Sequence, residues 1–175
     1  MAETPTPGNP TPGTPMQEIP RPRWKVTMML ADHAQAINGK LYIVGGGWTL
    51  TGPQPTPSGI AIKIEVPWNE ANRPHVLRLR LCDSGSRPIS IQTPVGNSAV
   101  ELMANFEVGR PPGVPPGTPL DVTLAFNLGP LPLPLGSRLR WVLDIDGNTE
   151  DYWHEAFSTR PAAPVIQLPP PSRPQ

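Results

Sequence analysis

The segment Asp144–Asp151, DIDGNTED, concentrates four carboxylates and one asparagine, and these are the oxygen ligands that calcium prefers. An EF-hand loop needs a glycine at its sixth position, whereas Gly147 is the fourth residue here, so the segment is not an EF-hand. Asp144, Asp146 and Asp151 would bind calcium only if a second loop contributed ligands. A solvent-exposed hairpin turn is the alternative interpretation, and it is the one that we favour.

Two tryptophans, Trp48 and Trp68, are expected at strand ends beside loops. Trp68 is followed by Asn69, Glu70 and Arg73, which are the polar neighbours that a sugar needs beside a stacking ring. These five residues therefore form a candidate surface for a ligand or a partner. The alternative is that both tryptophans only cover a sheet edge, because an aromatic ring buries a large apolar area.

Three consecutive glycines, Gly45–Gly47, lie between an apolar run and Trp48 and suggest a phosphate-binding loop. Such loops need a helix N-terminus or a following lysine, and the sequence GGGWTLTGP supplies neither. We therefore interpret the glycines as backbone geometry, for example a bulge or a close approach of two chain segments. At least one of the three is expected to adopt a conformation closed to residues with a Cβ.

Side chains that could catalyse hydrolysis occur without the partners that catalysis requires. The segment Cys82–Ser86, CDSGS, contains the serine and glycine of a protease nucleophile loop, but no suitable histidine and aspartate accompany it, so we expect a hairpin turn. Asp32 and His33 are neighbours in an expected strand and point to opposite faces. The histidines also lack the spacing of zinc ligands. A hydrolase is therefore the third choice, and no catalytic residue or cofactor is predicted.

Strands must position all of these residues, because the dominant hydrophobic period from Trp24 onward is two. In GIAIKIEV, for example, the apolar side chains of Ile60, Ile62, Ile64 and Val66 share one face. Turn signals such as NG and DGN separate the strands, and no long segment has a helical stripe free of glycine and proline. We predict an all-β fold, a single antiparallel β-sandwich of about eight or nine strands.

The 28 prolines and 16 glycines divide the chain into three parts. Residues 1–23 and 161–175 are predicted to be proline-rich arms, because they bury too little apolar surface to offset the entropy of ordering them. Residues 24–160 contain the alternating strands and have the length of one ordinary domain. We therefore place the β-sandwich in residues 24–160.

The charge balance and the apolar segments exclude two classes of partner. Fourteen basic and fourteen acidic residues cancel, and no basic block appears, so nucleic-acid binding is not expected. No apolar run approaches the ~20 residues that span a bilayer, and no signal peptide is visible. The single cysteine, Cys82, cannot form an internal disulfide. These features predict a soluble, cytoplasmic protein.

The stretch LADHAQAINGKLYIVGGGW, followed by IEVPW and later by DIDG, resembles a family of uncharacterised bacterial proteins. The resemblance covers most of Met28–Phe157. It supports the domain boundaries and implies no activity, cofactor or catalytic residue.

The function expected from these observations is non-enzymatic association with a second copy or with a protein partner. The segments VTMML, KLYIV and LGPLPLPLG offer more apolar surface than one buried face of each strand requires. A small-ligand module for carbohydrate or calcium is the alternative. In the C-terminal arm, Val165, Ile166 and Leu168 are strand formers between two prolines, and we predict that they add as a β-strand to an exposed sheet edge. The edge belongs either to the same molecule or to a neighbouring molecule, and we favour the neighbour.

Overall fold

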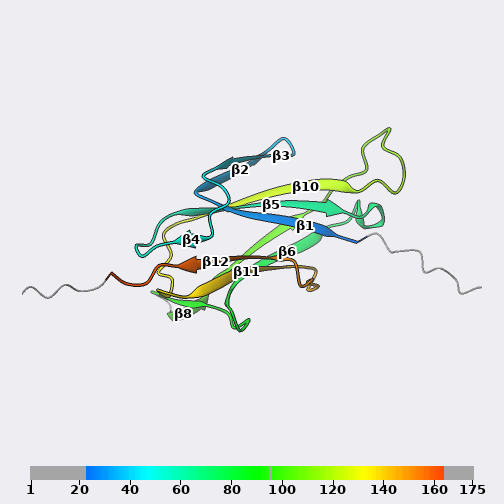
Figure 1. Ribbon diagram of the computed structural model, residues 1–175. Helices are drawn as coiled ribbons and strands as arrows, with labels where there is room; N and C mark the ends of the chain where they lie inside the picture. Colours follow the sequence, from blue (N-terminus) through cyan, green and yellow to red (C-terminus); the bar gives the residue numbers. More distant parts are fainter. Residues whose placement is uncertain (1–22, 95, 164–175) are drawn as a thin grey trace, which may run out of the picture.

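The computed structural model describes residues 23–94 and 96–163 (Figure 1). Within these ranges the chain forms twelve strands and one three-residue 3-10 helix, η1 (Trp68–Glu70), and it contains no α-helix. No helix in the described part is therefore long and apolar enough to cross a membrane. The prediction of an all-β fold is confirmed.

Three antiparallel strands form the narrow sheet, in the order β1 (Lys25–Ala31), β5 (Ser58–Val66) and β10 (Leu120–Leu128). The apolar residues of β5 that alternation placed on one face, Ile60, Ile62, Ile64 and Val66, are all 0% exposed. Their cross-strand neighbours are apolar as well, for example Met28 and Leu124 on either side of Ile62. The period of two therefore defines one buried face of this sheet.

Five strands form the wide sheet. Their order is β4 (Leu50–Thr51), β12 (His154–Thr159), β11 (Arg138–Ile145), β6 (His75–Asp83) and β9 (Glu101–Phe106). All neighbours are antiparallel except β4, which pairs in parallel with the end of β12. Leu77, Leu79 and Leu81 of β6 point to the buried face, together with Leu139, Trp141 and Leu143 of β11.

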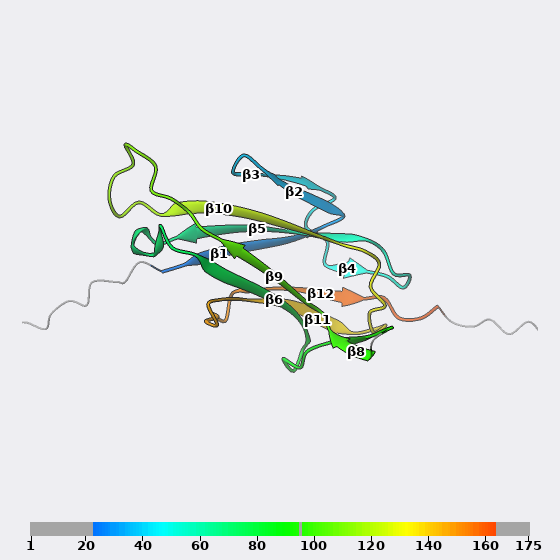
Figure 2. The ribbon, with the colours of Figure 1, turned by 180° about the vertical axis from the view of Figure 1, so that it is seen from behind.

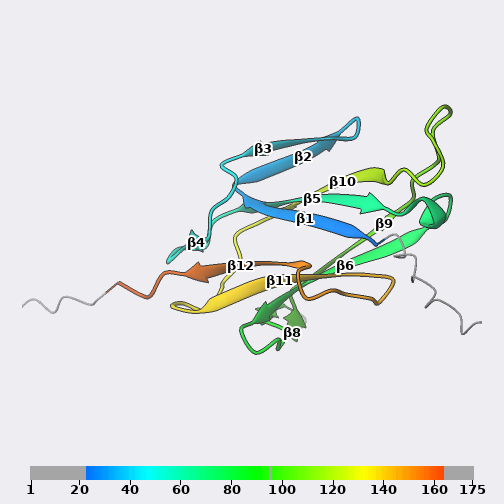
Figure 3. The same ribbon diagram turned by 45° about the vertical axis from the view of Figure 1, so that its right-hand side comes forward.

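The hydrophobic core lies between the two main sheets, which face each other as two layers (Figures 1 and 3). The expected eight or nine strands of a single sandwich are not confirmed, because two further two-stranded sheets are present among the described residues. These are β2 (His33–Ile37) with β3 (Lys40–Val44), and β7 (Ser90–Thr93) with β8 (Gly96–Ala99). The extra strands arise because the chain leaves the main sheets to form short hairpins.

The β2–β3 hairpin lies across the outer face of the narrow sheet, above β5 and β10 (Figure 1). Its turn is Asn38–Gly39, with φ of 51° and 72°, and these positive values are typical of the tight turn that the NG signal predicts. The hairpin approaches the sheet closely, since a Cβ on Gly59 would lie 2.9 Å from the Ala34 nitrogen. The Asn127 side chain accepts a hydrogen bond from the Ala34 N–H (3.0 Å) and donates one to the Ala34 carbonyl (2.8 Å).

Ion pairs occupy the other half of the outer face of the narrow sheet. Lys25 contacts Glu65 at 2.9 Å, and Lys63 contacts Asp121 at 3.0 Å. All four side chains belong to neighbouring positions on β1, β5 and β10. This half of the face is therefore charged and open to solvent, whereas the half beneath the hairpin is lined by small residues.

The two ends of the described chain lie at opposite ends of the molecule (Figure 1). The chain enters β1 at the end that carries η1, and it leaves β12 beside β4. Arg160 is held there, because its N–H donates to the Thr51 carbonyl (2.8 Å) and its carbonyl accepts from the Gly136 N–H (3.2 Å). The predicted strand-addition residues Val165, Ile166 and Leu168 lie outside the described residues, as does most of both predicted arms.

Candidate functional site

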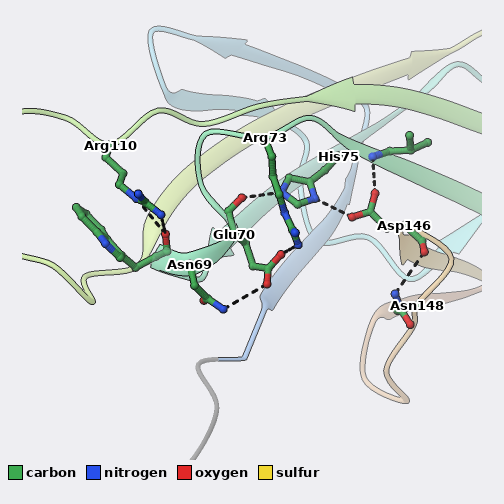
Figure 4. Close-up of polar contacts among 9 residues, drawn as sticks. Asn69, Glu70, Arg73, His75, Arg110, Asp146 and Asn148 are labelled. Carbon is green, nitrogen blue, oxygen red and sulfur yellow. Dashed lines mark hydrogen bonds and ion pairs between the residues drawn. The ribbon is translucent and has the colours of Figure 1, made fainter.

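A buried histidine lies at the end of the molecule where the chain enters β1. His75 is the first residue of β6 and is only 1% exposed. Its Nδ1 lies 2.7 Å from Oδ2 of Asp146, and its Nε2 lies 2.9 Å from the carbonyl oxygen of Glu70 (Figure 4). Asp146 reaches this position because β11 ends at Ile145, next to the start of β6, and a tight turn follows.

Both ring nitrogens of His75 have an oxygen partner. The carboxylate of Asp146 faces Nδ1 and the Glu70 carbonyl faces Nε2, so the two contacts fix the orientation of the buried ring. The ring is enclosed by aromatic side chains, stacked on Phe106 at 5.3 Å and in edge contact with Trp24 at 4.9 Å.

Asp146 is held in its ionised form by the groups around it. Burial alone would raise the pKa of Asp146, but the hydrogen bonds from His75 and from the Val76 N–H outweigh this and hold the pKa below its ordinary value. The positive charges of His75 and Arg73 act in the same direction. Asp146 also has a φ of 53°, a left-handed conformation that aspartate and asparagine tolerate better than most residues.

The loop around η1 provides further polar groups at the same end (Figure 4). Glu70 forms an ion pair with Arg73, and Asn69 donates to Glu70 at 3.4 Å. Arg110 lies over the Trp68 ring at 5.1 Å, and its Nη2 donates to the Trp68 carbonyl at 2.9 Å. One face of Trp68 is therefore covered by a guanidinium group and is not free to stack on a sugar.

A polar recess of about 350 Å³ opens beside this network. Its lining combines two aromatic rings with charged and amide groups: Trp24, Trp153, Glu70, Arg73, Asp146, Asn148, Thr149 and Glu150. Trp153 is buried, and among the described residues its indole Nε1 has no hydrogen-bond partner. An unpaired buried donor is costly, and this nitrogen is shielded from solvent rather than open to the recess.

The acidic segment forms a turn whose carboxylates have separate partners. Asp144 lies 3.4 Å from Arg80, whereas Asp146 contacts His75, and Asp151 is exposed. Asp146 and Gly147, with φ of 53° and 79°, form the turn that the DG signal predicts. In residues 23–94 and 96–163 no three His, Cys, Asp or Glu side chains gather as a metal ion would need.

Trp48 lies at the opposite end of the molecule from Trp68. Its ring is in edge contact with Phe157 at 5.7 Å, and it lines an apolar cavity of about 40 Å³ near β4. The other walls of this cavity include Trp141, Leu131, Leu133 and Leu135. The structure thus brings Asn69, Glu70 and Arg73 together with Trp68, but it does not bring Trp48 to the same site.

The glycine run that precedes Trp48 adopts backbone conformations and close contacts that other residues would not tolerate. Gly45 and Gly47 have φ of 61° and 86°, so the expected left-handed conformation is confirmed. A Cβ on Gly45 would collide with the carboxylate of Asp32, and one on Gly46 would lie 2.7 Å from Ile43. The run returns the chain from β3 to β1, where the Gly47 N–H donates to the Leu30 carbonyl at 2.7 Å.

The outer side of the β2–β3 hairpin exposes an apolar surface. Strand alternation places Ala34 and Ile43 toward the narrow sheet and Ile37, Tyr42 and Val44 away from it. These last three side chains are 46%, 53% and 62% exposed. We call them the hairpin face.

Two features of these surfaces have no local signal in the sequence. His75 and Asp146 are 71 residues apart, and Trp68 and Arg110 are 42 residues apart. The turn predicted at Cys82–Ser86 is present in the structure. Asp83 accepts hydrogen bonds there from the N–H groups of Gly85 (2.8 Å) and Arg87 (2.9 Å). The Cys82 thiol is buried, and burial raises its pKa.

Residues 26–154 match a protein family described as a family of unknown function, DUF6941. The match begins in β1 and ends at the first residue of β12, so it includes strands of both main sheets. The expected resemblance to an uncharacterised family is therefore confirmed. Neither a curated protein nor a solved structure matches the chain.

Proposed function

The chain belongs to the family DUF6941, and we propose that it is a non-enzymatic interaction protein that uses the hairpin face to bind a second copy or another protein. The concentration of exposed apolar side chains supports this proposal. Ten large apolar side chains of the described part are exposed, and four of them belong to the hairpin: Ile37, Tyr42 and Val44 on its outer side, and Ile43 on the side toward the narrow sheet. Exposed apolar side chains that gather in one patch are typical of interaction sites.

The hairpin face contributes to binding but is not sufficient for a stable complex by itself. Fully burying one large apolar side chain contributes about 1.5–3 kcal/mol, and these three are about half exposed, so together they contribute roughly 3 kcal/mol. Association itself costs at least about 4 kcal/mol in lost freedom of motion. A stable complex therefore needs a second contact beside the hairpin face.

The test compares two tyrosines of equal exposure. Tyr42 on the hairpin face and Tyr152 in the turn before β12 are both 53% exposed. Losing the apolar contact of Tyr42 costs about 1 kcal/mol, so Tyr42→Ser should weaken association about fivefold. Tyr152→Ser should have no effect. Size-exclusion chromatography with light scattering, over a range of concentrations of the full chain, measures both variants.

Two results would contradict this proposal. Equal weakening by Tyr42→Ser and Tyr152→Ser would remove the hairpin face from the contact. A parent chain that stays strictly monomeric at micromolar concentration would remove self-association and leave only a foreign protein as the partner.

A second candidate function is the binding of a small polar ligand in the recess beside Asp146. The recess places the amide of Asn148 and the hydroxyl of Thr149 beside two aromatic rings, and this combination suits a ligand rich in hydroxyl groups, such as a sugar. A ligand of the folded state raises the melting temperature, so a panel of sugars and calcium chloride tests this function. A shift with a sugar that disappears in Asn148→Ala supports it, and no shift with any compound contradicts it.

We also propose that the two main sheets act as one β-sandwich body and that the protein works in the cytoplasm. The free, buried thiol of Cys82 supports a reducing compartment. Measuring the fraction of Cys82 that is reduced in the native cell tests this assignment.

A further inference from the structure

The narrow sheet has an open edge at β10. Within the described residues β10 pairs only with β5, and its other side carries no backbone hydrogen bond. β9 is likewise the last strand of the wide sheet, and Figure 2 shows β9 and β10 on the same side of the molecule. The narrow sheet has three strands and the wide sheet has five, so the narrow sheet is not wide enough to cover β9 of the wide sheet.

The side chains along this edge are incompletely buried. Val122, Leu124 and Phe126 point to the core side of β10, yet all three remain half-buried. On the central strand β5, the neighbouring core residues are fully buried. Leu102 and Ala104 of β9 are also half-buried on the core side. One more strand beside β10 would cover both groups.

The β10 edge also lacks the usual protection against strand pairing. Proteins guard open edges with proline, charge or very short strands. β10 is nine residues long, contains no proline, and has no charged residue after Asp121. The β9 edge is shorter, at six residues, and begins with Glu101. A strand added to β9 would also have no layer opposite it, whereas one added to β10 would cover the core side of β9.

We propose that the segment Pro164–Pro169 of a second copy adds to β10 as a fourth strand of the narrow sheet. Its apolar side chains fit the edge, because strand alternation places Ile166 and Leu168 on one face and Val165 and Gln167 on the other. Ile166 and Leu168 point inward, over Leu102 of β9, and Gln167 points to solvent. The flanking prolines lack N–H groups and limit the pairing to a short run.

The position of Arg160 indicates that the segment comes from a second copy. β12 leads to Arg160 and lies against β1, at the side of the molecule away from β10. Three strand spacings and one layer separate β12 from the open position, a straight distance of about 17 Å. Five residue steps, from Arg160 to Val165, span at most about 17–18 Å. The loop 129–137 closes that end of the core, so the segment of the same chain cannot take a straight path.

This contact goes beyond the function proposed above and uses a different surface. It supplies backbone hydrogen bonds, whereas the hairpin face supplies apolar area. A chain that donates its own segment and accepts another forms either closed rings or open filaments.

The test compares two proline substitutions in the C-terminal segment of the full chain. Ile166→Pro removes an N–H group from the pairing strand, while Ser172→Pro, the matched control, lies beyond it. Light scattering measures the mass, and hydrogen exchange measures the protection of β10 amides that point away from β5. Ile166→Pro should reduce the mass to that of a monomer and lower this protection about tenfold or more. Ser172→Pro should behave as the parent.

A synthetic peptide of residues 161–175 provides a second readout, because it should compete with the donated segment and reduce the mass of the parent chain. The same peptide with the Ile166→Pro change should not compete. A monomeric parent whose outward β10 amides are unprotected would overturn the proposal. A third outcome is a monomeric parent whose β10 amides are protected, with this protection lost in Ile166→Pro. The segment would then pair with β10 of the same chain, and the second copy would be overturned as the donor. Tyr42→Ser tests the hairpin face separately and should leave β10 protection unchanged.

Discussion

Removing the carboxylate of Asp146 is expected to destabilise the fold through His75. The informative variants are Asp146→Gly, which removes the carboxylate but keeps the left-handed backbone at φ 53°, and Asp146→Asn. In Asp146→Asn the amide oxygen still accepts from the Val76 N–H. Its NH₂ group donates to a neutral His75, whose Nε2 continues to donate to the Glu70 carbonyl. Asn therefore satisfies every hydrogen bond that Gly leaves open.

The magnitude follows from burial. The Asp146 side chain is 40% exposed, so the loss is smaller than the ~3–5 kcal/mol of breaking a fully buried ion pair. An unpaired nitrogen on the buried His75 ring costs about 2 kcal/mol, and the lost bond to the Val76 N–H costs about 1 kcal/mol. Asp146→Gly should therefore lower the free energy of unfolding by about 3 kcal/mol, which is roughly 10 °C in Tm. Asp146→Asn should lose less than about 1 kcal/mol.

Urea unfolding at neutral pH, followed by tryptophan fluorescence, measures both variants against the parent. The difference between Gly and Asn carries the test, because both variants remove the same charge. If the two free energies of unfolding agree within error, the hydrogen bonds of the His75 ring do not carry the stability, and the reasoning is refuted.

Three further predictions concern the same fold. The pKa of Asp146 lies below its ordinary value of 3.8, so its contribution to stability is present above about pH 4 and is lost as the pH falls through the lowered pKa; the parent should therefore lose more stability in acid than Asp146→Asn, as measured by thermal melting at several pH values. Gly45→Ala should cost more than Gly39→Ala, because both have positive φ but only Gly45 is crowded, by a margin of about 1 kcal/mol; equal losses in urea would show that crowding is unimportant. Gly59→Ala places a methyl group against the Ala34 backbone and should cost about 1–3 kcal/mol while loosening the β2–β3 hairpin, and unchanged hydrogen exchange of the hairpin amides would contradict this.

Local patterns in the sequence were sufficient to predict the strands and several turns. The alternation in GIAIKIEV places four core residues on one face, and all four are fully buried in β5. The dipeptides at Asn38 and Asp146 predict tight turns because only a few residue types tolerate positive φ. These signals act over a few residues, and the physical cause is contained in the segment itself.

The arrangement of the strands and the polar network could not be predicted in the same way. His75 finds Asp146 only because β6 and β11 become neighbours in the wide sheet, and no local pattern specifies that pairing. The separation of Trp48 from Trp68 follows from the length of β5, which carries the chain from one end of the molecule to the other (Figure 1). A glycine inside a strand, such as Gly59, predicts that another part of the backbone comes close, but the sequence does not say that this part is the β2–β3 hairpin.

The central position of β5 in the narrow sheet has a consequence for the speed of folding. β5 pairs with β1, which precedes it, and with β10, whose first residue, Leu120, pairs with Val66. The chain between Val66 and Leu120 must be closed into a long loop before β5 and β10 can pair. This closure costs chain entropy before the pairing contributes any stability, so the domain should refold slowly, in milliseconds to seconds. During synthesis on the ribosome, one edge of β5 stays bare until residue 128 has emerged. A chain stalled before that point leaves one edge of β5 unpaired, although four side chains of this strand are fully buried in the folded protein, and it should be a substrate for chaperones.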